Sequence, residues 1–234
     1  MIKQFINFEW KQFSRSSYFQ KGIAIKILLV FLVLYFGGAA LMLGIGLYFI
    51  LKEVLPTLDP IVVVNNFLIF WLLFDLVIRF FMQQLPVMNV KPLMVIPIKR
   101  DTIIHYLLGK TVISFFNFIP IFIFLPFSIV LLTKDYPVLN VVCWFFATVF
   151  LGLSINFLNF LINKSNNVFY VLVSLFAILI GLEYFNIFKI SAPIGAAFNA
   201  LYNNPWLALI PISVMLGFYY INFSFIKKVF YLDV

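Results

Sequence analysis

The sequence is poor in the residues that most enzymes and soluble surfaces need. Only 10% of its 234 residues are charged, and it has one histidine, His105, and one cysteine, Cys143. A single cysteine excludes an intrachain disulfide, and a histidine without a Cys/His cluster is a poor basis for a metal site. Soluble domains carry about 25% charged residues, so this chain has too little polar surface to coat a water-soluble globule.

Long apolar runs fill most of the chain instead. A hydrocarbon core of about 30 Å needs roughly 20 apolar residues of helix, and backbone amides in lipid must be satisfied internally. Six runs approach that length: 27–50, 61–82, 112–132, 138–162, 168–188 and 206–226. We therefore expect an all-α fold, a polytopic membrane protein with six transmembrane helices in one domain over residues 27–234.

Residues 1–26 precede the first run and show a different pattern. At 100° per residue, the apolar side chains, Trp10 among them, fall on one side and most polar ones on the other. This predicts an amphipathic helix lying in the cytoplasmic membrane interface. Glu9 falls within the apolar face, which is costly unless it meets a cation; alternatively, its carboxylate reaches the lipid headgroups.

Lysine and arginine are unevenly divided between the two sides of the predicted membrane. Thirteen lie on the side of the N-terminus, against Lys52, Lys134 and Lys189 on the other. By the positive-inside rule both termini are cytoplasmic. The net charge of +8 thus reflects orientation, and no basic and aromatic patch outside the membrane supports nucleic-acid binding.

Two connections are long. The one over 83–110 is predicted to be cytoplasmic and carries four basic residues, whereas 183–205 is predicted to be external. Within the external segment, 192–202 is small and apolar without charge and precedes the turn-prone Asn203-Asn204-Pro205. We interpret it as a re-entrant or interface-lying helix.

The cytoplasmic connection carries the most specific pattern. It reads Gln83-Gln84-Leu85-Pro86, then Leu93-Met94-Val95-Ile96-Pro97-Ile98-Lys99-Arg100, and ends with Leu107-Leu108-Gly109-Lys110. This resembles the element between the second and third spans of ABC-2-type permeases, the membrane subunits of many bacterial ABC exporters. Phe8-Glu9-Trp10-Lys11 is similar to the start of their N-terminal interfacial helix. The chain departs from the family at Gln84 and at Met88-Asn89, where an acidic residue and a Gly-Thr pair are common.

The resemblance implies a permease subunit of the bacterial inner membrane. Such a subunit moves substrate by alternating access, driven by a separate ATP-binding-cassette ATPase, and pairs with a second permease copy or half. The nearest branch is an uncharacterised group of longer permeases from Bacteroidota, of which this chain would be the N-terminal half.

In that family the cytoplasmic connection couples the spans to the ATPase, which would give this role to Pro97, Lys99, Arg100 and Asp101. Pro97 can start a short helix with Asp101 in its first turn. Lys99 and Arg100 would pair with acids on a partner or with anionic headgroups. An ordinary basic inner loop is the alternative.

Polar residues inside the spans are the other candidates. Asp75 and Arg79 are four residues apart, close enough to form an ion pair. Intramembrane charges usually face protein or a water-filled cavity, so the pair is a candidate gate or a structural ion pair. Asn156, Asn159 and Asn163 share one helix face, compatible with interhelical bonds, a subunit contact or a pathway lining.

No catalytic arrangement is apparent. Gly109-Lys110-Thr111 looks like the end of a phosphate-binding loop, but Ile104 stands where the first glycine is needed. We therefore expect no enzyme activity and no cofactor in this chain. A non-transporting membrane scaffold or anchoring protein remains the alternative function.

The orientation can be tested with two single-cysteine variants. In a Cys143→Ser background, Lys99→Cys should react with a membrane-impermeant maleimide only after the cells are opened, because the positive-inside rule places it in the cytoplasm. Lys134→Cys, on the opposite side, should react in intact cells. Labelling of Lys99→Cys from outside would contradict the orientation and everything built on the cytoplasmic connection.

Overall fold

The computed structural model describes residues 23–83, 99–163, 166–185 and 189–232, with Lys11 and Arg15 as isolated positions. All regular secondary structure in these residues is helical. The helices, in chain order, are α3 (Ile23–Val54), α4 (Pro60–Met82), α6 (Arg100–Val112), α7 (Phe115–Thr133), α8 (Val138–Ile162), α9 (Asn166–Tyr184), α10 (Ser191–Asn203), the 3₁₀ helix η2 (Pro205–Ala208) and α11 (Leu209–Leu232).

Within the described residues, five helical segments are long and apolar enough to cross a membrane. They are Val30–Val54, Pro60–Met82, Phe115–Thr133, Val138–Ile162 and Pro205–Lys228. The predicted span over 168–188 corresponds to α9, whose continuously described apolar part, Val173–Tyr184, is shorter. Six membrane crossings therefore stay a prediction, while the all-helical class is confirmed.

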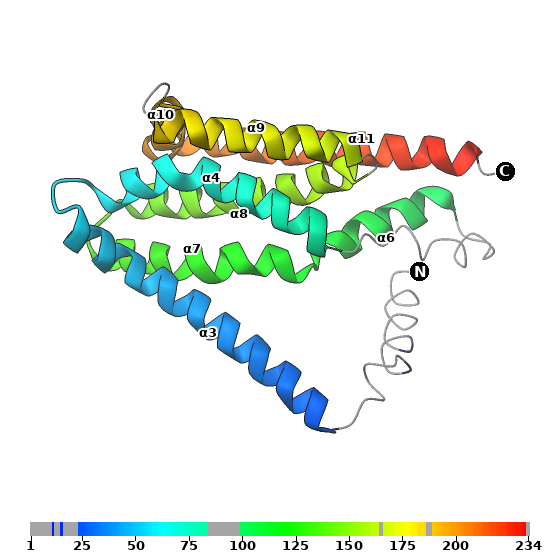
Figure 1. Cartoon of the computed structure of the whole chain (residues 1–234), viewed down its shortest axis with the longest axis horizontal. Helices are drawn as coiled ribbons and strands as arrows, with labels where there is room; N and C mark the ends of the chain where they lie inside the picture. The colour runs from blue at the N-terminus through cyan, green and yellow to red at the C-terminus, as the bar shows by residue number, and fades with distance from the viewer. Residues whose placement is uncertain are drawn as a thin grey trace.

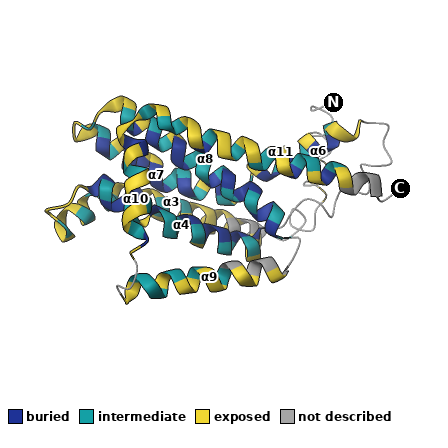
Figure 2. Cartoon of the chain, turned by 90° about the horizontal axis from the view of Figure 1, so that it is seen from above, coloured by how far each residue is buried: buried dark blue, intermediate teal, exposed yellow. Residues whose placement is uncertain are grey.

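The helices form a bundle around α8. Figure 1 shows α4, α7, α8, α9 and α11 running along one common direction, with α8 packed against both α7 and α11. Figure 2 shows α9 at one side of the bundle with many exposed residues along it. The outward faces carry large apolar side chains such as Leu34, Phe81 and Tyr184, all more than two-thirds exposed. Such a surface is suited to lipid rather than water.

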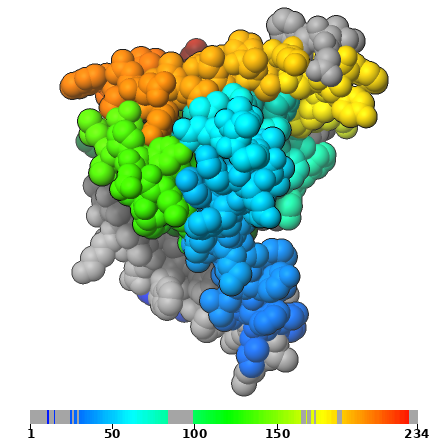
Figure 3. All heavy atoms as spheres, turned by 90° about the vertical axis from the view of Figure 1, so that its left-hand side faces the viewer, coloured from blue at the N-terminus to red at the C-terminus, as the bar shows by residue number. Residues whose placement is uncertain are grey.

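α3 leaves the bundle at an angle. Its C-terminal half packs against α7, whereas its N-terminal half points away from the other helices (Figures 1 and 3). The contact is close because Gly44 has no side chain: a Cβ there would lie 3.0 Å from the Ile123 carbonyl carbon. Gly37, on the projecting half, has nothing within 4 Å of the equivalent position.

The core has two main parts. The first surrounds Trp144 of α8, which packs against Phe124 and Phe127 of α7. The second lies at the opposite end of the bundle, where one face of α6 meets α8 and α11. That face repeats at helical spacing and consists of Ile103, Ile104, Leu107 and Leu108, all at most 3% exposed.

The helix α6 begins inside the connection predicted over 83–110 and extends two residues beyond it. It begins at Arg100, three residues later than the start predicted at Pro97, with Asp101 in its first turn, and it ends at Val112. Ile113 and Ser114 are not helical, and α7 starts at Phe115, three residues after the predicted start of the third span. The break between α6 and α7 therefore falls inside the apolar run 112–132. The sequence pattern does not mark the break, because apolar residues continue across it. We call Ile113–Ser114 the hinge.

α10 is the helix expected inside the 183–205 segment. It crosses the bundle rather than following it (Figures 1 and 2) and packs against α4. A Cβ on Gly195 would lie 2.9 Å from Asn66 Cα, so the two backbones approach closely. Of residues 1–26, where an interfacial helix is predicted, the structure describes Lys11, Arg15 and the start of α3. The Arg15 N–H donates to the Lys11 carbonyl at 3.1 Å.

The α3–α7 contact should depend on glycine at one position only. Gly44→Ala should lower the free energy of unfolding by about 1–3 kcal/mol, because the added methyl overpacks the contact with α7. Gly37→Ala should be neutral or stabilise by up to about 1 kcal/mol, since alanine is the better helix former. Thermal unfolding in detergent measures both, and equal effects would contradict the packing.

Candidate functional site

Buried polar side chains gather where α4, α7 and α8 meet the hinge. In a bundle this apolar they are the exception, and most are hydrogen-bonded to one another. They come from α4 and its C-cap, from the last turn of α6, from the first turn of α7 and from α8. We call the following residues the polar network: Asp75, Arg79, Gln83, Thr111, Asn117, Asn156 and Asn159.

Arg79 is at the centre of the polar network and is 0% exposed. Its Nε donates to Asp75 Oδ2 at 2.7 Å, one turn earlier in α4. Its Nη1 donates to Asn117 Oδ1 at 2.8 Å, and its Nη2 donates to the Phe116 carbonyl at 3.0 Å. One guanidinium thus joins α4 to the first turn of α7.

A proline explains why the Phe116 carbonyl is available. In a regular helix this carbonyl would accept the N–H of the residue four positions later, which is Pro120 and has no N–H. Arg79 supplies the missing donor. Pro120 therefore leaves the Phe116 carbonyl available to accept from the guanidinium.

Asn117 connects α7 back to α6. Its Nδ2 donates to the carbonyls of Thr111 and Val112, at 3.1 and 2.8 Å. The last carbonyls of a helix have no intrahelical partner, so Asn117 satisfies two of them across the hinge. The cation of Arg79 is also favourable beside these carbonyls, which form the negative end of the α6 dipole.

α8 completes the polar network. Gln83 Nε2 donates to Asn156 Oδ1 at 2.7 Å, and Asn156 Nδ2 donates to Thr111 Oγ1 at 2.9 Å. Asn159 Nδ2 donates to Gln83 Oε1 at 3.4 Å. The end of α4 and the end of α6 are therefore both hydrogen-bonded to the same face of α8.

The structure brings together most of the intramembrane residues that the sequence predicted. Asp75 and Arg79 form the expected ion pair, and Asn156 and Asn159 lie on one face of α8, in contact with α4. Asn163 is only partly buried and reaches Asn159 at 3.5 Å, so it is at the edge of the network.

Three members were missed by sequence reasoning. Gln83 continues the four-residue spacing of Asp75 and Arg79, which was a usable signal. Thr111 and Asn117 gave no such signal. Their role depends on the hinge between them, and the sequence does not mark the hinge because apolar residues continue through it.

The predicted coupling residues lie at the start of α6. Lys99, Arg100 and Asp101 are all exposed. Asp101 Oδ1 pairs with Lys227 Nζ of α11 at 3.0 Å, which links the start of α6 to α11 at the surface. Pro97, Glu9 and Trp10 lie outside the described residues.

A second contact holds α6 on α11. The His105 ring stacks on Phe223 with centroids 4.7 Å apart, and its Nδ1 lies 2.5 Å from the Tyr219 hydroxyl. Together with the buried face of α6, these contacts make α6 and α11 one packed unit at this end of the bundle.

The opposite end has a smaller set of polar contacts. Trp144 Nε1 donates to Asn65 Oδ1 at 2.7 Å, and Asn65 Nδ2 donates to Asn199 Oδ1 at 2.7 Å, which ties α8, α4 and α10 together. In the turn between α7 and α8, the Tyr136 hydroxyl donates to Asp59. Burial and that hydrogen bond raise the pKa of Tyr136 above its ordinary value.

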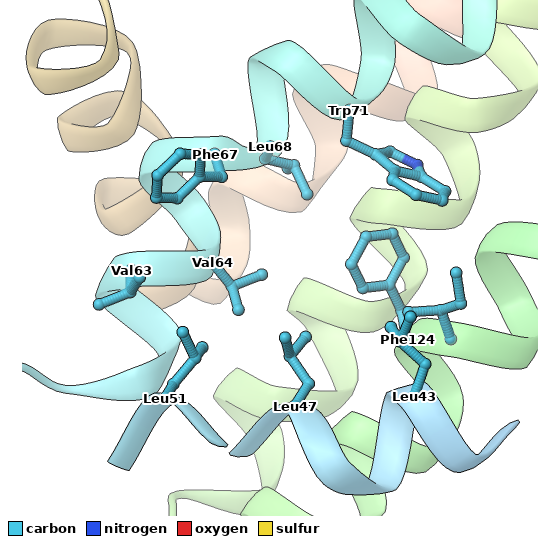
Figure 4. Close-up of a pocket in the computed structure, with 10 residues that line it drawn as sticks. Leu43, Leu47, Leu51, Val63, Val64, Phe67, Leu68, Trp71 and Phe124 are labelled. Carbon is cyan, nitrogen blue, oxygen red and sulfur yellow. The ribbon is translucent and has the colours of Figure 1, made fainter. Parts of the chain in front are cut away.

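An apolar groove lies between α3, α4 and α7. Its volume is about 220 Å³, and its lining comes from leucines of α3, such as Leu47 and Leu51, and from larger side chains of α4 and α7, such as Trp71 and Phe124 (Figure 4). The lining is almost entirely hydrocarbon, so it has no means of orienting a polar ligand. Among the described residues, no group of three His, Cys, Asp or Glu side chains is placed to hold a metal ion.

These features define an all-helical protein built like a multi-pass membrane protein, with five candidate spans among its described residues. A family model matches residues 9–234, and the chain belongs to that family, DUF5687, a family of unknown function. No curated protein and no solved structure matches the chain.

Arg79 should be the most sensitive position of the polar network. Arg79→Met should lower the free energy of unfolding by about 3–5 kcal/mol, because it leaves the Asp75 carboxylate buried without its partner. Adding Asp75→Leu should restore part of the loss, since the double variant no longer buries an unpaired charge. Thermal unfolding in detergent measures both.

The exposed Lys52 provides the control: Lys52→Met should change the unfolding free energy by no more than about 0.5 kcal/mol. A double variant as unstable as the sum of its single variants would contradict the ion pair.

Proposed function

We propose that this protein is the transmembrane subunit of an ABC-2-type exporter in the bacterial inner membrane. Both termini are cytoplasmic in this proposal, and α6 lies at the cytoplasmic end of the bundle. A separate ATP-binding-cassette ATPase docks there and drives alternating access, and a second permease copy or half completes the pathway.

The observation that carries the proposal is the construction of α6. It is a short helix of its own, separated from the next span by a two-residue break. A permease without an ATPase domain must receive mechanical work through a rigid element outside the membrane, and a packed helix on a hinge is such an element. The polar network spans the hinge, so movement of α6 would reach α4, α7 and α8 through it.

Charge supports docking at this end. Among the described residues, the α6 end of the bundle carries Lys99, Arg100, Lys110, Lys227 and Lys228, and the other end carries Lys52, Lys134 and Lys189. Lys99 and Arg100 are exposed at the first turn of α6. Exposed cations of this kind steer and orient a partner that presents acidic residues.

The exposed apolar surface of α3 is where a second copy would pack. Within the apolar segment Val30–Val54, only Gly44 is buried within this chain. A paired permease copy would cover part of that surface, and lipid would cover the rest.

The alternative is a non-transporting scaffold that anchors partner proteins in the membrane. One observation favours it: the groove of Figure 4 is almost wholly apolar, so it lacks the set of polar groups that selects a polar substrate.

Charge reversal at α6 tests the docking. The tagged protein is purified from its native membranes, and the ATP-binding-cassette ATPase retained with it is quantified by mass spectrometry. Lys99→Glu combined with Arg100→Glu should lower the retained amount by about tenfold or more, because two attractive contacts become repulsive. The matched control reverses two charges at the other end, Lys52→Glu with Lys134→Glu, and should retain the wild-type amount.

The two candidate functions give different results. Unchanged retention by the α6 variant would refute docking at Lys99 and Arg100. Absence of any such ATPase from the wild-type preparation, with other proteins retained, would refute the exporter and favour the scaffold.

A further inference from the structure

A second cavity lies beside the hinge, on the side of α7 that faces α8. Its volume is about 290 Å³, and we call it the hinge crevice. Its lining is apolar apart from Asn117 and includes Ile113, Phe118, Ile121, Val149, Gly152 and Leu153. None of the sequence motifs pointed to it, because its walls come from three helices and from the break between two of them.

The hinge crevice exists because two positions leave space. Gly152 of α8 has no side chain, and a Cβ built there would lie 3.9 Å from Pro120 Cγ, an ordinary contact distance. Residues 113–114 interrupt the helix, so no continuous row of side chains closes this side of α7. The volume is therefore fixed by backbone positions rather than by a flexible side chain.

The surroundings indicate what fills it. Ile113 is 76% exposed and Phe118 is 42% exposed, so the crevice borders an outward-facing apolar surface of a candidate span. Ile121 is six residues beyond Phe115, where α7 starts, or about 9 Å at 1.5 Å per residue. If the bilayer core begins where the candidate span begins, this is the depth of the upper part of an acyl chain rather than of a headgroup.

A lysine lies in the chain at the shallow end of the crevice. The Ile113 N–H donates to the Lys110 carbonyl at 3.3 Å, so Lys110 belongs to the turn that borders the crevice. This end of the bundle also carries Lys99, Arg100, Lys227 and Lys228. A positive end above an apolar crevice is complementary to an anionic amphiphile, and the cytoplasmic leaflet supplies one in its acidic phospholipids.

We propose that the hinge crevice binds one acyl chain of an anionic phospholipid, whose phosphate lies near Lys110. The proposal rests on the proposed function for its orientation, with α6 at the cytoplasmic face. The chain would pack beside Asn117 and Pro120, next to the carbonyl and amide groups that hold Arg79. Lipid bound there would stabilise the hinge in the observed geometry and make coupling depend on lipid composition.

The test uses a photoactivatable phosphatidylglycerol with a diazirine in its acyl chain. The protein is reconstituted in phosphatidylcholine nanodiscs containing the probe, irradiated and mapped by peptide mass spectrometry. In the wild type, peptides with residues 112–121 and 149–153 should be labelled more strongly, per exposed side chain, than the projecting half of α3. Gly152→Leu should reduce that labelling by about tenfold, because its side chain takes the place of about two methylene groups of the lipid.

Two variants serve as controls. Gly217→Leu adds the same side chain to an open position on α11, with nothing within 4 Å of its Cβ, and should leave the labelling unchanged. Gly152→Ala adds only a methyl group that fits beside Pro120, so it should fold as the wild type and keep most of the labelling. An unchanged thermal unfolding temperature of Gly152→Leu confirms that loss of label is not loss of fold.

The headgroup is tested separately. Lys110→Gln should abolish the preference for the phosphatidylglycerol probe over a phosphatidylcholine probe with the same chain, while both still label the crevice. Equal labelling of Gly152→Leu and wild type would overturn the crevice, and an unchanged preference in Lys110→Gln would overturn the headgroup assignment. Both readouts are independent of any ATPase, so failure here is distinguishable from failure of the proposed function.

Discussion

The guanidinium of Arg79 is buried completely in a bundle that is otherwise nearly all hydrocarbon, and it cannot be left without acceptors there. A carboxylate from its own helix, an amide from α7 and a carbonyl from the first turn of α7 supply them. Each acceptor constrains a different part of the backbone. The arrangement of α4, α7 and the hinge follows from satisfying this one cation.

The other polar contacts at this end continue the hydrogen-bond network that begins at Arg79. Asn117 accepts from Arg79 and donates to the last carbonyls of α6, so one side chain serves the cation and the helix end together. Gln83 and Asn156 carry the connection to α8 and return it to Thr111. A chain of hydrogen bonds of this kind in a low-dielectric interior rigidifies the elements that it joins. It therefore connects α6 mechanically to three of the candidate spans.

The two ends of the bundle differ in what holds them. At the α10 end, a single asparagine between a tryptophan and another asparagine bridges three helices, and close backbone contacts at Gly44 and Gly195 bring helices together. At the α6 end, an ion pair, a stacked histidine and a buried apolar face fix α6 on α11. The polar network lies between α6 and the helices α4, α7 and α8.

The sequence by itself determined the class of the protein and the charged residues that are costliest to bury. Run length and the scarcity of charge specify apolar helices, because lipid leaves the backbone no other partners. A four-residue spacing specifies the Asp75–Arg79 pair, because it is a local property of one helix. Only the tertiary structure decided that the apolar run starting at 112 is broken, that Asn117 faces Arg79, and that Gly152 leaves a cavity. Asn117 meets Arg79 across 38 positions of sequence, and Gly152 faces Pro120 of another helix, which no local pattern records.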